Sequence, residues 1–203
     1  MKSVVLCLPC YDGKVSLRWM SAYMRTRDLL TQQNIKFDFV CVVDCGIIQF
    51  ARTSLVTQAL ETDADHILLV DGKQIWEPVG VLRMLENLND VDVVVAPAVC
   101  DEGKFYANYA VDDDGEVITR NHLKKATHSS VAFMGINRGV LESMCTAYPE
   151  LEYEFNGVKH FDLFDTMIEN KRFIGEDTAF SLRMIRAGND IWIDEGIRVM
   201  RVK

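Results

Sequence analysis

The sequence lacks several features that would place it in a familiar class of protein. No stretch of 18 consecutive residues is wholly apolar, so there is no candidate membrane-spanning helix. The first apolar run stops at Pro9, which is too short for a signal peptide, and it reads better as a first strand. We find no internal repeat, low-complexity tract or linker. Because 49% of the 203 residues are hydrophobic, we expect one domain with a full core over residues 1–203.

The sequence has no second CxxC-type cysteine pair and no excess of positive charge. Cys7-x-x-Cys10 has neither a second cysteine pair nor a histidine at ligand spacing, so we expect buried free thiols in a reducing, cytoplasmic protein. The net charge of −8 argues against a large sequence-independent surface for nucleic acid, although it leaves a local basic cleft open. The sequence also lacks the G-x-G-x-x-G loop that binds a dinucleotide, since the segment from Leu8 to Gly13 does not have the glycines needed to bind a phosphate. This argues against a Rossmann-like redox protein.

Strand and helix patterns alternate along the first half of the chain. Alternation of this kind predicts a mostly parallel central sheet with helices on both faces. In such sheets ligands bind beyond the carboxyl ends of the strands, here after Leu8, Val43 and Val70. We expect strands over 3–8, 36–43, 66–70 and 92–97 and helices over 17–33, 48–61 and 78–88.

The second half is less regular. Residues 104–120 resemble a hairpin, and Asp112 to Gly115 is more typical of a solvated turn than of a metal site. Residues 148–173 are polar and aromatic, and we expect a loop there. The remaining patterns predict strands over 131–136, 191–193 and 197–202 and helices over 138–145 and 177–187.

Four segments, in this order, resemble the small bacterial and viral glycosyltransferases of the GT-A fold. LCLPCYDGKV is similar to that family's first strand and nucleotide loop, and QFARTSLVTQAL to its Ala-Arg-Asn helix start, with Thr53 in place of Asn. ADHILLVDGKQIWEPVGVLRML is similar to its metal-binding strand and the helix after it. The fourth segment, FDLFDTMIENKRFIGEDTAFSLRMIRAGNDIWID, is similar to its acceptor segment. The resemblance implies a nucleotide-sugar-binding half over 1–100 and an acceptor-binding half over 101–203.

The resemblance implies a donor site for a nucleoside diphosphate sugar, most often a UDP-sugar. Tyr11 and Asp12 would contact the base and ribose, or simply form a Tyr-Asp-Gly turn. Asp44 would accept from a pyrimidine N–H, or end its strand in a turn. Arg52 would reach the nucleotide, buttress Asp71, or lie on a helix surface.

The metal-binding motif of the family is degenerate in this sequence. Its Asp-x-Asp holds a divalent ion on the donor diphosphate, whereas here Asp71 is followed by Gly72 and Lys73. The family's closing strand ends in a histidine ligand, where this chain offers Arg201. Two fixed cations can bind phosphate oxygens without a metal, so we expect no required cofactor. The alternative is Mn²⁺ or Mg²⁺ at Asp71.

The acceptor hydroxyl needs a carboxylate base, and the resemblance implies Glu176 and Asp177, with Asp177 as first choice. Both residue types also suit the start of a helix, where they would serve as caps, and capping and catalysis need not exclude each other. Asp165 and Phe164 are expected to contact the acceptor. The sequence thus predicts an inverting glycosyltransferase with a glycan or another hydroxyl compound as acceptor. A catalytically silent nucleotide-sugar-binding homologue and a viral DNA-base glycosyltransferase remain alternatives.

Overall fold

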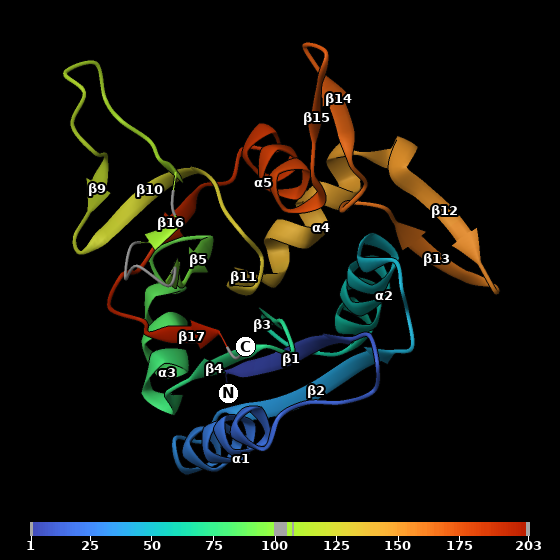
Figure 1. The fold of residues 1–203 in the computed structure, drawn as a ribbon, viewed down its shortest axis with the longest axis vertical. Helices are drawn as coiled ribbons and strands as arrows, with labels where there is room; N and C mark the ends of the chain where they lie inside the picture. Colours follow the sequence, from blue (N-terminus) through green and yellow to red (C-terminus); the bar gives the residue numbers. More distant parts are fainter. Residues whose placement is uncertain (1, 100–104, 107, 202–203) are drawn as a thin grey trace.

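A central mixed sheet organises the molecule (Figure 1). The computed structural model describes residues 2–99, 105–106 and 108–201. The strand order is β2-β1-β3-β11-β5-β16-β10-β8, and β9 pairs with β10. The strands of this sheet are β1 (Ser3–Cys10), β2 (Lys36–Val43), β3 (His66–Val70), β5 (Val93–Val95), β8 (Asn108–Tyr109), β9 (Thr119–Arg120), β10 (Leu123–His128), β11 (Phe133–Asn137) and β16 (Ile191–Ile193).

Most of the long strands run in one direction. β1 is parallel to both β2 and β3, and β5 is parallel to β16. β11 lies between β3 and β5 and is antiparallel to both, so β3 and β5 also point the same way. β10 is antiparallel to β16 and to β8. The predicted α/β class with a mostly parallel central sheet is therefore confirmed, with one reversed strand in the middle that the alternation did not indicate.

Helices cover both faces of the sheet, as Figure 1 shows. They are α1 (Leu17–Gln32), α2 (Ile48–Glu61), α3 (Pro78–Asn87), α4 (Arg138–Ala147) and α5 (Glu176–Arg186). Val5 and Cys7 of β1 pack in a core cluster with residues of α2, α4 and α5. Val4 and Leu6 point to the opposite face and pack with α1 and α3. Since successive side chains of a strand point to opposite faces, β1 is buried on both sides, as its continuous apolar run predicts.

Among the residues that the structure describes, four two-stranded pairs lie outside the main sheet. They are β4 (Gln74–Trp76) with β17 (Val199–Arg201), β6 (Ala98–Val99) with β7 (Phe105–Tyr106), β12 (Glu152–Phe155) with β13 (Val158–Phe161), and β14 (Met167–Glu169) with β15 (Arg172–Ile174). A short 3₁₀ helix, η1 (Pro149–Leu151), precedes β12. The loop expected over residues 148–173 is therefore wrong, because this segment forms two hairpins.

The turn at Asp112 to Gly115 agrees with its sequence. The carboxylate of Asp112 accepts hydrogen bonds from the backbone N–H groups of Asp114 and Glu116, and Gly115 has a φ of +84°. Val111 and Val117 form an isolated antiparallel bridge across the turn. The three aspartates are exposed. They therefore form a solvated turn, although the expected hairpin start at residue 104 lies outside the described residues.

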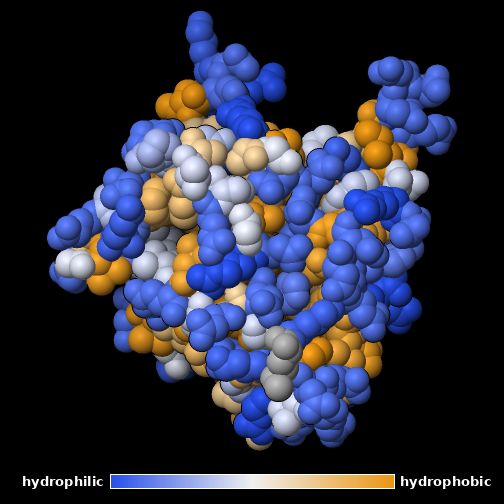
Figure 2. Space-filling model, turned by 180° about the vertical axis from the view of Figure 1, so that it is seen from behind, coloured by the Kyte–Doolittle hydropathy of each residue, from blue (hydrophilic) through white to orange (hydrophobic). Residues whose placement is uncertain are grey.

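The surface of the molecule is largely hydrophilic when it is seen from behind, with apolar residues in small separate patches (Figure 2). In the part of the chain that the structure describes, no helix combines the length and apolar character needed to cross a bilayer. Cys7, Cys10, Cys41, Cys45 and Cys145 are free thiols, whereas Cys100 lies outside the described residues. The expected boundary between the two halves, at 100/101, lies outside them as well.

Candidate active site

A cavity of about 880 Å³ opens at the carboxyl ends of β1 and β3. This is the edge at which parallel strands present their following loops to a ligand. The N-terminal turns of α2 and α5 and the end of β17 close its other sides. The lining residues that matter for chemistry are the polar ones: Tyr11, Asp12, Lys14, Ser16, Arg52, Asp71, Lys73, Gln74, Ser130, Glu176, Asp177 and Arg201.

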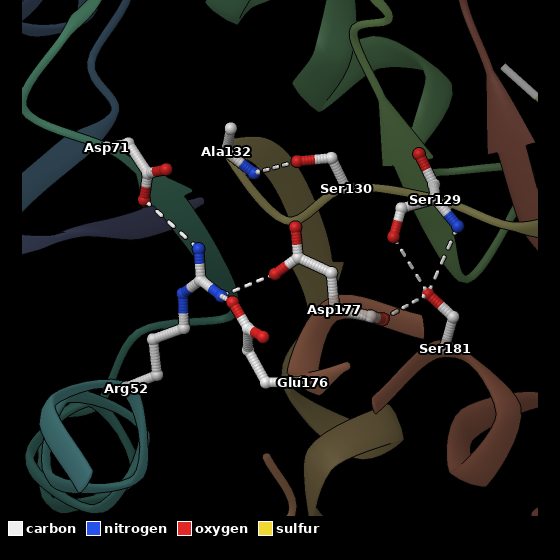
Figure 3. Close-up of polar contacts among 8 residues, drawn as sticks. All are labelled: Arg52, Asp71, Ser129, Ser130, Ala132, Glu176, Asp177 and Ser181. Carbon is white, nitrogen blue, oxygen red and sulfur yellow. Dashed lines mark hydrogen bonds and ion pairs between the residues drawn. The ribbon is translucent and has the colours of Figure 1, made fainter. Parts of the chain in front are cut away.

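Arg52 joins three carboxylates inside this cavity (Figure 3). Its Nη1 lies close to Asp177 Oδ1 and 3.4 Å from Glu176 Oε1, and its Nη2 lies 3.4 Å from Asp71 Oδ1. The guanidinium side chain is only 5% exposed, whereas the three carboxylate side chains are about 30% exposed. Because the other two contacts are long for N–H···O hydrogen bonds, Asp177 is the close partner. The expectation that Arg52 buttresses Asp71 agrees with this geometry, and a surface arginine does not.

Packing below the cavity fixes the position of Arg52. Its Cζ lies 6.0 Å from the centroid of the Phe164 ring, which stacks on Phe180 of α5 at 4.1 Å. The next residue, Thr53, is buried and donates a hydrogen bond of 3.1 Å to Asp162 Oδ1. Burial raises the pKa of Asp162, although the Thr53 hydroxyl acts in the opposite direction. The start of α2 is thereby attached to the segment that precedes α5.

Glu176 and Asp177 begin α5 without capping it. The N-cap residue is Gly175, and no side chain makes a capping hydrogen bond there. The helix start is instead held by Ser181, whose hydroxyl contacts the backbone carbonyl of Asp177 at 2.9 Å and the backbone N–H and carbonyl of Ser129 (Figure 3). Both carboxylates therefore face the cavity. The side-chain capping bond that the sequence left open is therefore not formed, although both acids lie in the first turn, where their charge favours the helix dipole.

Three lining cations have no acidic partner in the described part of the chain. Lys14, Lys73 and Arg201 are exposed and form no ion pair with any described residue. Arg201 lies opposite Gln74 in the β4–β17 ladder, one position from Lys73. The two positions at which the resemblance expects metal ligands thus lie on the same edge of the cavity, and both carry positive charge.

The loop after β1 brings Tyr11 and Asp12 to the cavity mouth. Tyr11 is 73% exposed, and a Cβ on Gly46 would lie only 3.4 Å from its ring, so the loops after β1 and β2 touch here. The carboxylate of Asp12 accepts from the backbone N–H of Lys14, and Gly13 has a φ of +65°. The Tyr-Asp-Gly turn exists, and it leaves the Tyr11 ring free for a ligand.

Three expected site residues lie elsewhere. Asp44 is exposed at the end of β2 with a φ of +56°, and it is absent from the cavity wall. Asp165 is exposed, also outside the wall, and its backbone carbonyl accepts from Arg183. Phe164 is fully buried. Its ring supports Arg52 and has no surface to offer an acceptor, so its expected acceptor contact is incorrect.

The donor set around Asp71 does not fit a divalent metal. The nearest carboxylates, Glu176 and Asp177, share Arg52 with it, and Lys73 follows it in the chain. A fixed cation among these acids would repel a second one. Among the residues that the structure describes, no group of three or more His, Cys, Asp or Glu side chains is arranged to hold a metal ion.

Lys14, Gln74 and Ser130 line the cavity although the sequence did not single them out. Lys14 follows a turn, where a solvated lysine is ordinary, and Ser130 belongs to no pattern before the fold is known. Gln74 is 5% exposed and carried one available signal, because it directly follows the degenerate motif.

No protein-family model and no curated protein sequence matches the chain. Solved structures are similar to it in fold. The structure of GalNAc-T7 with UDP, GalNAc and Mn²⁺ matches with a TM-score of 0.61 and 9% identity, over 100% of this chain and 43% of that one. The structure of S. aureus TarS in complex with UDP-GlcNAc matches with a TM-score of 0.53 and 10% identity, over 100% of this chain and 59% of that one. The chain therefore spans about half the length of these proteins, and it has the GT-A-like fold of nucleotide-sugar transferases.

Proposed function

We propose that the chain is a glycosyltransferase that moves a sugar from a nucleoside diphosphate donor to an acceptor hydroxyl. The observation that carries this proposal is the charge arrangement of one cavity at the strand ends. Along the β3–β4 and β17 edge it has cations that form no ion pair with a described residue, and at the start of α5 it has two carboxylates. A diphosphate leaving group and an acceptor hydroxyl need these opposite charges on opposite sides of the anomeric carbon. One of the two fold neighbours was solved with UDP and GalNAc and the other with UDP-GlcNAc, so UDP-sugars are the first donors to test.

On the donor side, Lys73 and Arg201 would bind the diphosphate oxygens, with Lys14 beside them. Lysine supplies a point charge and arginine a forked pair of donors, and both suit phosphate. As the bond between the sugar and the phosphate breaks, negative charge grows on the departing diphosphate, and fixed cations would stabilise it without reorganisation. Tyr11 is available to stack on the base, with Asp12 near the ribose.

On the acceptor side, Asp177 would act as general base and Glu176 would lie beside it. The acceptor oxygen attacks the anomeric carbon, its proton passes to the Asp177 carboxylate, and the nucleoside diphosphate leaves with the electron pair of the broken bond. One displacement of this kind inverts the anomeric configuration. The proposal therefore includes an inverting transfer that depends on no metal.

The test is turnover of UDP-glucose, UDP-GlcNAc and UDP-GalNAc, read as released UDP with water or an added hydroxyl compound as acceptor. Asp177→Asn should reduce turnover by about 10²- to 10⁴-fold with little change in UDP affinity. Near-normal turnover in both Asp177→Asn and Glu176→Gln would remove the pair from catalysis. UDP binding without turnover of any of these donors would favour the silent nucleotide-sugar-binding homologue.

Glucosylated hydroxymethyl-pyrimidine DNA as product would identify the alternative of a viral DNA-base glycosyltransferase. The test adds hydroxymethylated duplex DNA to the same donors and follows sugar incorporation. The net charge of −8 makes a free glycan or another small hydroxyl compound the favoured acceptor.

A further inference from the structure

The contacts of Arg52 connect the two sides of the cavity. Asp71 follows β3 on the donor side, whereas Glu176 and Asp177 open α5 on the acceptor side. Arg52 comes from a third element, α2, and reaches both groups with its two terminal nitrogens (Figure 3). No other described side chain forms ion pairs with acids of both groups.

We propose that Arg52 is a positioning residue, which holds the base Asp177 at a fixed place relative to the donor-side Asp71. This inference rests on the proposed function, since it takes Asp177 as the base. A planar guanidinium suits the task because its nitrogens point in fixed directions, whereas a lysine ammonium makes one flexible contact. Arg52 thereby sets the reacting geometry before a substrate arrives.

Burial and charge separate this role from that of a diphosphate ligand. Arg52 is 5% exposed and has three carboxylates around it, so their combined negative charge exceeds its own. An incoming diphosphate would have to approach that negative surface. Lys73 and Arg201 are exposed and pair with no described acid, so they offer the anion a better site. Arg52 therefore binds the protein's own carboxylates in preference to a diphosphate.

The surroundings of Arg52 also resist its movement. The Phe164 ring lies against the guanidinium, and Thr53 ties the same turn of α2 to Asp162. On the opposite side, Ser181 fixes the backbone of Asp177 to Ser129. Asp177 is thus held twice, through its backbone by Ser181 and through its carboxylate by Arg52.

The kinetic experiment compares Arg52→Met and Arg52→Lys with the wild type, using the UDP-sugar that the wild type turns over. Arg52→Met should reduce kcat about 30-fold or more with KM changed less than about three-fold, because a misplaced base affects the chemical step. Arg52→Lys should restore at most about ten-fold of that loss, since it keeps the charge but makes only one flexible contact. A large rise in KM with kcat retained would make Arg52 a donor ligand and overturn the inference. So would a kcat of Arg52→Lys equal to that of the wild type, because a positive charge without the fixed directions of the guanidinium would then be enough.

Arg138→Met is the matched control for the loss of an interhelical arginine. Arg138 donates to the carbonyl oxygens of Leu60 and Thr62 at the far end of α2, away from the cavity. Its removal should lower the melting temperature and leave kcat and KM of the folded enzyme unchanged. An equal loss of kcat in Arg138→Met would show that Arg52 acts only through the stability of α2.

A second measurement reads the same contact without any turnover. In urea unfolding, Asp177→Asn should destabilise the wild type, because it removes the close partner of Arg52. In the Arg52→Met background the same change should stabilise the protein, because it relieves repulsion among Asp71, Glu176 and Asp177. The factor by which Asp177→Asn changes the unfolding equilibrium constant should therefore differ about five-fold or more between the wild type and the Arg52→Met background. Additive effects would overturn the inference. A wild type that turns over no UDP-sugar but shows this coupling would refute the proposed function alone.

Discussion

At the scale of single residues, the proposed chemistry of the cavity depends on charges that have no partner among the described residues. Lys73 and Arg201 form no ion pair with a described acid, whereas Arg52 contacts three carboxylates. We expect Lys73→Ala and Arg201→Ala each to weaken UDP binding about ten-fold or more, because a hydrogen bond to a charged group contributes about 1.5–3 kcal/mol. Isothermal titration with UDP measures this. Lys171→Ala, on the exposed β14–β15 turn, should leave the affinity unchanged. UDP affinity unaltered in both cavity variants would contradict the assignment.

Residue types near the strand ends could be predicted, but their orientation could not. Asp71, Lys73, Glu176, Asp177 and Arg201 all reach one cavity, as the resemblance implied. Nothing local in the sequence says that Phe164 is buried or that Arg52 crosses to α5, because both depend on packing between segments more than 100 residues apart.

At the scale of elements, the strands and helices with turn residues at both ends were the easiest to predict. β2, α2, β3 and β16 have the expected bounds, because continuous apolar runs and turn residues mark their ends. The reversed direction of β11 depends on pairing with β3 and β5, which no local pattern reports. The hairpins in residues 148–173 were missed because their strands are mostly exposed. One signal was available: Asn156 and Gly157 both have positive φ, and Asn-Gly is the strongest short hairpin pattern.

Asp194 joins α3 to the segment after β16, and this junction predicts a pH dependence. Its buried carboxylate accepts from Arg83 Nε at 2.6 Å and from Asn87 at 2.7 Å. Burial alone would raise the pKa of Asp194, but these bonds and the Gly196 N–H outweigh it, so the pKa lies below its ordinary value. The folded state therefore favours the ionised form. The resulting stability is present above about pH 4 and is lost as the pH falls through the lowered pKa.

Asp194→Asn should reduce the free energy of unfolding by roughly 2 kcal/mol at pH 7, because it removes a buried carboxylate that accepts from the half-exposed Arg83 and from Asn87. It should also flatten the loss of stability below about pH 4. Urea unfolding between neutral and acid pH measures both effects. Asp190→Asn is the control, since its ion pair with Lys125 is exposed and is worth about 1 kcal/mol or less. An equal cost for the two substitutions would contradict the role of Asp194.

At the scale of the whole molecule, an acidic protein contains a cavity in which charges balance. The chain has a net charge of −8, yet the cavity wall carries the bases Lys14, Arg52, Lys73 and Arg201 and the acids Asp12, Asp71, Glu176 and Asp177. Fold neighbours share the fold of the molecule at only 9% and 10% identity, so very different sequences form it.

At this scale we expect that neither UDP binding nor turnover depends on a divalent metal. Ligand that binds only the folded state raises apparent stability by mass action, so UDP should raise the melting temperature. If Lys73 and Arg201 neutralise the diphosphate, the shift should be equal in EDTA and in Mn²⁺, and turnover should survive the chelator. Lys73→Asp removes one cation and restores the spacing of two acids around Gly72. In this variant the UDP shift should become smaller in EDTA and should recover with Mn²⁺, because an oxygen pair can then hold the ion on the phosphates. Wild-type turnover that is lost in EDTA and restored by Mn²⁺ would show that a metal, and not these two side chains, carries the diphosphate charge.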